Sequence, residues 1–127
     1  HLRVEPGPCV FTRGARGIIE LPVAHAEGKF AAPDDIHDGL EASGRVALRY
    51  VTADGAEATY PANPNGSRGG VAGICNASGT VLGLMPHPER FVTRTQHPRW
   101  TRPGAPGIGH GLAIFENAVR YAAERAR

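Results

Sequence analysis

The sequence predicts a mixed α/β domain, or a piece of one, in which short strands form a sheet and a helix closes the chain. Runs with the length and composition of strands include residues 2–5, 45–52, 71–75 and 80–84. The clearest is 45–52, where Val46, Leu48 and Tyr50 alternate with less apolar neighbours. Apolar residues at helical spacing follow at residues 112–126.

The first half of the chain alternates strand and turn signals. Residues 2–5 alternate apolar and polar, and Pro6-Gly7-Pro8 ends that strand. Residues 18–24 have strand composition, although Pro22 indicates a sheet edge or a strand end. Residues 33–43 predict a short helical turn with Asp34 as N-cap and Gly44 as stop. Asp54-Gly55 predicts a hairpin turn, with a returning strand at 57–60.

The second half is predicted to lead one strand directly into a proline-flanked histidine. Residues 61–70 read as a loop, and residues 71–75 and 80–84 as buried strands joined by a turn at Gly79. The second strand runs into Met85-Pro86-His87-Pro88-Glu89-Arg90. Residues 93–109 should be irregular. The last helix, residues 112–126, is expected to bury the face that carries Leu112, Phe115, Val119 and Ala122.

Composition narrows the class of protein. A net charge of +2 over 127 residues argues for neither a nucleic-acid nor a membrane partner, and Arg94, Arg99 and Arg102 read as a solvated face or loop. Two cysteines indicate a reduced, cytoplasmic protein, and no apolar run suits a membrane span. No metal-binding pattern is present. Because the chain begins without methionine, we expect it to be a fragment or a processed product.

His87 is the strongest catalytic candidate on chemical grounds. The prolines on either side stiffen its backbone, and it follows a strand, at an end where α/β proteins collect catalytic groups. Glu89 could bond one ring nitrogen of His87, orient the ring and stabilise its protonated form, leaving the other nitrogen free to take a proton from a nucleophile. An isolated His-x-Glu is nevertheless more often an inert turn.

Other candidates are weaker on the residues alone. His25-Ala26-Glu27-Gly28 also follows a strand, and Gly28 would allow close backbone approach to a ligand, but a surface turn is the simpler interpretation. Cys75 resembles a nucleophile on a turn. A nucleophile elbow needs a following helix, and another strand follows here, so a buried strand cysteine is favoured. Cys9 reads as structural.

Four stretches together resemble one family, the glutaminase component of phosphoribosylformylglycinamidine synthase. They contain the strings Pro22-Val23-Ala24-His25-Ala26-Glu27-Gly28, Val46-Ala47-Leu48-Arg49-Tyr50-Val51, Asn63-Pro64-Asn65-Gly66-Ser67 and Gly83-Leu84-Met85-Pro86-His87-Pro88-Glu89-Arg90. The resemblance implies a class I glutamine amidotransferase domain, an α/β, flavodoxin-like fold with a Cys-His-Glu triad. Residues 1–127 would be the carboxyl-terminal portion of that domain, without the amino-terminal half that holds the nucleophile.

The resemblance also implies roles and partners. His87 would be the general base and Glu89 its orienting partner, while His25, Glu27 and Gly28 match a stretch near the glutamine pocket. Ammonia from glutamine would pass to a large synthetase subunit, assisted by a small accessory subunit. No cofactor is expected in this chain, because ATP and magnesium belong to the synthetase, which converts formylglycinamide ribonucleotide to its amidine.

The sequence departs from the family pattern in two places, which keeps alternatives open. The Gly-x-Cys-Asn-Gly elbow is missing, so the chain alone should be inactive, and alanine stands at position 26 where the family usually has glycine. The alternatives are a cysteine hydrolase that uses Cys75, a non-catalytic module that docks on the synthetase, and another class I amidotransferase. The Asn63–Ser67 string disfavours the last of these.

Overall fold

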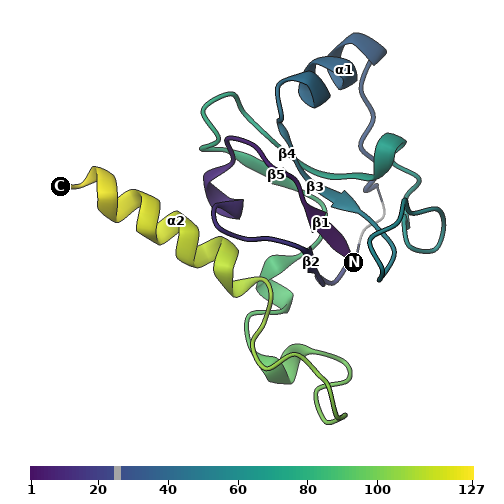
Figure 1. The fold of residues 1–127 in the computed structure, drawn as a ribbon, viewed down its shortest axis with the longest axis vertical. Coiled ribbons are helices and arrows are strands. Elements are labelled where there is room, and N and C mark those ends of the chain that lie inside the picture. The colour runs from purple at the N-terminus through teal and green to yellow at the C-terminus, as the bar shows by residue number, and fades with distance from the viewer. Residues whose placement is uncertain (25–26) are drawn as a thin grey trace.

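The computed structural model describes residues 1–24 and 27–127, and its centre is a five-stranded sheet in the order β2-β1-β3-β4-β5 (Figure 1). Every ladder between these strands is antiparallel. The strands are β1 (Leu2–Val4), β2 (Ile18–Ile19), β3 (Val46–Tyr50), β4 (Val71–Cys75) and β5 (Leu82–Leu84).

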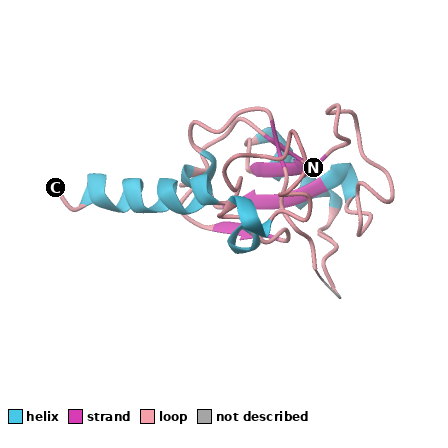
Figure 2. Ribbon diagram, turned by 90° about the horizontal axis from the view of Figure 1, so that it is seen from below, coloured by secondary structure: helices cyan, strands magenta, loops and turns pink. Residues whose placement is uncertain are grey.

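In the part of the chain that the structure describes, two α-helices and four short 3-10 turns accompany the sheet. The helices are α1 (Asp34–Ala42) and α2 (Leu112–Arg125), and the 3-10 turns are η1 (Val10–Thr12), η2 (Arg68–Gly70), η3 (Pro88–Arg90) and η4 (Arg94–Gln96). The amino-terminal part of α2 contacts η1 and η3, and the rest of the helix extends away from the sheet (Figures 1 and 2). In the described part of the chain, neither helix is long and apolar enough to cross a membrane.

The core lies on both faces of the central strand β3. Leu48 and Tyr50 pack with Leu2 of β1 in the largest apolar cluster, and each of the three is at most 2% exposed. Ala47, the residue before Leu48, packs with Cys9 and Cys75 in a separate cluster. Because neighbouring strand residues point to opposite faces, β3 is buried on both sides rather than half-exposed.

Most predicted elements are present, and the α/β class is confirmed. The strands predicted at 2–5, 45–52, 71–75 and 80–84 contain β1, β3, β4 and β5. The strand predicted at 18–24 ends after Ile19, because the Glu20 N–H bonds to His110 instead of a strand and Pro22 has no N–H. Its edge position is confirmed, since β2 is the outermost strand.

Two local predictions are wrong. Asp34 is the first residue of α1, and Pro33 occupies the N-cap. Residues 57–60 form a single bridge, Val51 to Glu57, rather than a strand. The reason is that the chain turns back on itself there, with the Asn63 N–H bonded to the Thr59 carbonyl instead of to a sheet partner.

The buried face of α2 also differs from the predicted one. Phe115 and Val119 are 42% and 70% exposed, whereas Ile114 and Asn117 are buried. The Asn117 side-chain amide donates to the carbonyls of Phe11 and Arg13, at 2.9 Å each. These bonds to a distant segment hold the Asn117 face inward and leave the more apolar face outward.

Candidate active site at the end of strand β5

His87 is held on a short, rigid connection between β5 and η3. The Met85 N–H donates to Ala72 of β4 at 3.1 Å, and Pro86 is fully buried. The His87 N–H then donates to the Pro22 carbonyl at 2.8 Å. The histidine backbone is therefore tied on one side to the sheet and on the other to the segment that follows β2.

The His87 ring is paired with Glu89, as the sequence predicted. Nδ1 of His87 lies 2.8 Å from Oε1 of Glu89. A carboxylate can only accept, so Nδ1 carries the proton. The pKa of Glu89 is lowered, first by its own backbone N–H and then by His87. An ionised carboxylate at Nδ1 orients the ring and stabilises the imidazolium.

The other ring nitrogen is not free, which differs from the sequence prediction. Nε2 of His87 lies 3.2 Å from the carbonyl oxygen of Ala24. The Ala24 carbonyl oxygen therefore occupies the position beside Nε2 where a nucleophile would have to lie. The cause is the extended segment after β2, whose Pro22 and Ala24 carbonyls both face His87. To act as a base, Nε2 must break its contact with Ala24.

The predicted substrate residues fall partly within the structure. His25 lies outside the described residues. Glu27 is exposed and Gly28 is buried, and both line a pocket of about 260 Å³ against the strand residues of β4 and β5. Met85 lines the same pocket. Since Met85 is two residues from His87, the structure brings the predicted glutamine-binding stretch to the end of the sheet that carries the predicted base.

Comparison with known proteins identifies the family of the chain. Residues 1–122 match the CobB/CobQ-like glutamine amidotransferase domain. The chain belongs to that family.

Relatives of this amidotransferase chain bear out the resemblance read from its motifs. It is 44% identical, over 96% of its length and 47% of the relative, to phosphoribosylformylglycinamidine synthase subunit PurQ of Dehalococcoides mccartyi. The chain is 50% identical to the subunit of the same name from Salinibacter ruber, over 94% of this chain and 47% of the relative. A chain in the structure of PurLQS from Thermotoga maritima aligns with a TM-score of 0.64 and 31% identity, over 95% of this chain and 45% of that one. The chain spans about half the length of the curated relatives it matches.

The two cysteines of this amidotransferase chain are placed as structural residues. Cys75 is 5% exposed, packs with Cys9, and pairs with Leu82 at the turn end of the β4–β5 hairpin. His87 follows the opposite end, past Leu84. Burial, with the neighbouring Cys9 thiol, raises the pKa of Cys75. Because the thiolate is the nucleophile, this environment argues against the hydrolase that would use Cys75.

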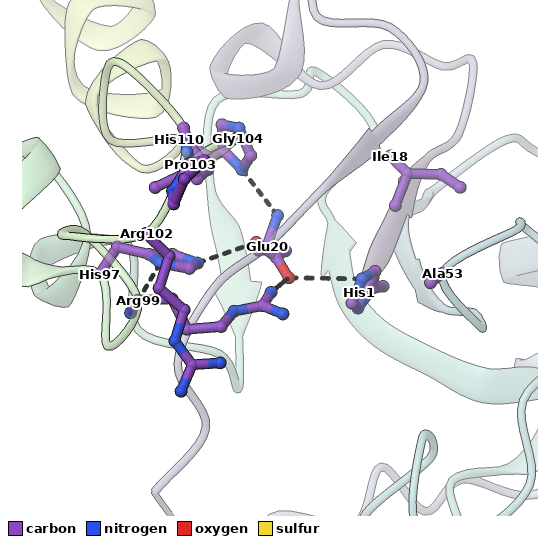
Figure 3. A pocket seen from close by; sticks show the side chains of 12 residues that line it. His1, Ile18, Glu20, Ala53, His97, Arg99, Arg102, Pro103, Gly104 and His110 are labelled. Atoms are coloured by element: carbon purple, nitrogen blue, oxygen red, sulfur yellow. Dashed lines mark hydrogen bonds and ion pairs between the residues drawn. The ribbon is translucent and has the colours of Figure 1, made fainter.

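A second polar cluster surrounds Glu20, and sequence reasoning missed it. Figure 3 shows His97, Arg99 and His1 converging on the Glu20 carboxylate, at 3.1, 3.5 and 3.3 Å. Nδ1 of His110 accepts the Glu20 N–H at 2.9 Å. Glu20 is 77 residues from His97, so no sequence pattern signalled the pair.

The Glu20 cluster fastens residues 97–110 to the end of β2 and lines a pocket of about 410 Å³. Among the residues that the structure describes, no group of three or more His, Cys, Asp or Glu side chains is arranged to hold a metal ion.

Proposed function

We propose that this chain supplies the general base and its orienting carboxylate to a glutaminase site. The observation that supports this is the 2.8 Å contact between Nδ1 of His87 and Oε1 of Glu89 on the rigid turn after β5. A base held in this way is the arrangement that nucleophilic hydrolysis of an amide requires. Family membership narrows the amide to the side chain of glutamine.

In the proposed reaction, His87 is protonated at Nδ1 only, and its unprotonated Nε2 leaves the Ala24 carbonyl and takes the proton of a cysteine thiol. The thiolate attacks the carboxamide carbon of glutamine. The carbon–nitrogen bond then breaks as Nε2 returns the proton to the departing ammonia, leaving a thioester. Water attacks the thioester as Nε2 takes its proton, the carbon–sulfur bond breaks to release glutamate, and Nε2 returns the proton to the thiolate. Glu89 stabilises the imidazolium throughout.

The nucleophile in this proposal is not Cys9 or Cys75, because both are buried together away from His87. We assign it instead to the part of the domain that the relatives contain and this chain does not match. Residues 1–127 alone should then form no thioester intermediate and release no ammonia.

We further propose that the chain acts in purine biosynthesis together with synthetase subunits. The relatives are named as subunits of phosphoribosylformylglycinamidine synthase, and the matched solved structure is that of PurLQS. Ammonia would pass to the large synthetase subunit, with a small accessory subunit in the complex. That synthetase would use ATP and magnesium to amidate formylglycinamide ribonucleotide. A cytoplasmic location stays a prediction.

A non-catalytic docking module is the second candidate, and one observation favours it. The outward face of α2 exposes Phe115 and Val119, and the helix extends away from the sheet (Figure 2). An apolar face of this kind suits contact with another protein surface. Under this alternative the complex would form without any need for His87.

A hybrid enzyme tests the proposal. Residues 1–127 are fused to the amino-terminal half of the Dehalococcoides mccartyi relative, and glutamate release from glutamine is measured. His87→Ala should lower kcat by roughly 10²–10⁴-fold, the usual contribution of a positioned base. His1→Gln is the matched control, because His1 is similarly exposed and also pairs with a glutamate, Glu20. A hybrid that binds the synthetase but releases no glutamate would favour the docking module.

A further inference from the structure

Residues 27–30 have no partner strand, yet the Asn63–Ser67 loop binds two of their backbone groups. The Asn65 side-chain amide donates to the Gly28 carbonyl at 2.5 Å. The Phe30 N–H donates to the Ser67 hydroxyl at 3.0 Å. Buried backbone groups must find a partner, and side chains provide it here where no sheet ladder does.

The loop that makes these contacts is itself tightly bonded. The Ser67 hydroxyl donates to Oδ1 of Asn65 at 2.7 Å, and the Asn63 amide donates to the Ser67 carbonyl at 2.9 Å. Ser67 is 2% exposed and Asn63 is 7% exposed. Because Oδ1 of Asn65 accepts from Ser67, the nitrogen of that amide is the atom that faces Gly28. The Asn65 amide, which donates to Gly28, and the Ser67 hydroxyl, which accepts from Phe30, are therefore held in place before any ligand arrives.

Residues 22–24 contact the candidate base. The Pro22 carbonyl accepts the His87 N–H, and the Ala24 carbonyl faces Nε2 of His87. His87 thus contacts Pro22 and Ala24, and the loop contacts Gly28 and Phe30. Residues 27–30 line the pocket beside β4 and β5.

We propose that Asn65 and Ser67 are positioning residues for the glutamine site, which they shape by fixing the backbone at Gly28 and Phe30. This inference rests on the proposed glutaminase function. The bonds to Gly28 and Phe30 lie outside the sheet ladders, so their loss should loosen the segment without dismantling the fold. Preorganised sites bind more tightly because less freedom is lost when the ligand enters.

The first test uses the chain itself and needs no activity. Amide hydrogen exchange at Phe30 is compared in the wild type, Ser67→Ala and Asn65→Asp. Asn65→Asp keeps the acceptor for Ser67 but removes the donor to Gly28. Both variants should raise exchange at Phe30 by about tenfold or more, and exchange in β3 should stay slow. Unchanged protection at Phe30 would overturn the proposal.

The second test measures glutamine kinetics in the active hybrid. Each variant should raise KM for glutamine by about tenfold, as expected when a buried hydrogen bond is lost, with a change in kcat of less than about threefold. Asn76→Asp is the control, because Asn76 bonds its own hairpin loop in the same manner, at 2.8 Å to the Thr80 N–H, without touching residues 27–30. Its KM should not change.

Outcomes separate this inference from the function on which it rests. An active hybrid whose KM is unaffected by Asn65→Asp and Ser67→Ala would overturn the positioning role alone. If Ser67→Ala does not fold, Asn65→Asp decides, since its side chain has nearly the same shape. An inactive parent hybrid would instead contradict the glutaminase function, and with it the assignment of glutamine to this pocket.

Discussion

The substitution Gly111→Ala tests how the last helix supports the candidate active site. Gly111 precedes α2 and packs against the turn η3, where its N–H donates to the Phe91 carbonyl at 2.8 Å. A Cβ atom added at Gly111 would lie 2.0 Å from the Pro88 carbonyl oxygen and 2.6 Å from its carbon. Both are backbone atoms, so no side-chain rotation relieves the overlap.

The size of the effect follows from these distances. Contacts of Cβ atoms below 3.0 Å essentially never occur, so η3 and α2 must separate by about 1 Å. Overpacking of this kind costs about 1–3 kcal/mol, or a fall in Tm of roughly 5–15 °C for a domain of this size. Pro88 stands between His87 and Glu89, so the same shift should lengthen their 2.8 Å contact.

Urea unfolding and hybrid kinetics measure the two consequences. Gly107→Ala is the control, because an added Cβ there meets nothing within 4 Å and its φ is ordinary. We expect Gly111→Ala to lose stability and to lower kcat roughly tenfold, as an active-site displacement near 1 Å does. Equal stability and equal kcat in the two alanine variants would show that α2 does not brace the turn, and would refute this reasoning.

Three further predictions concern named side chains. Glu89→Gln should lower kcat in the hybrid by roughly 10²-fold without raising KM, since the ring loses its ionised partner; an unchanged kcat would remove Glu89 from the site. Cys75→Ser should keep at least half of the turnover, and an inactive but folded variant would revive Cys75 as nucleophile. Arg49→Met should cost about 1–2 kcal/mol at pH 7 in urea unfolding, discounted because the Glu41 side chain is 37% exposed. The hydrogen bond from Arg49 lowers the pKa of Glu41, so this stabilisation is full above the ordinary carboxyl pKa and is lost as pH falls through the lowered value. The urea midpoints of wild type and Arg49→Met should therefore converge in strongly acidic solution, and a constant gap would contradict the role of Glu41.

Features that depend on neighbouring residues could be predicted from the sequence. Alternation in residues 45–52 and the glycine turn at Gly79 locate β3 and the β4–β5 hairpin within a few residues. The pairing of His87 with Glu89 is local as well, because two residues separate them and prolines restrict the backbone between β5 and η3. These features follow from chain stereochemistry over a few residues.

Contacts between distant residues were decided only by the tertiary structure. The Ala24 carbonyl that occupies Nε2 of His87 is 63 residues away in sequence. Asn117 turns α2 by bonding to Phe11, 106 residues away, which overrides the apolar pattern of the helix. Sequence periodicity records which face is apolar, but the net free energy depends on which polar groups find partners once the chain is folded. The candidate base and its carboxylate could therefore be identified from the sequence. The contact of the Ala24 carbonyl with that base, and the contacts of the Asn63–Ser67 loop with residues 28 and 30, could be identified only from the fold.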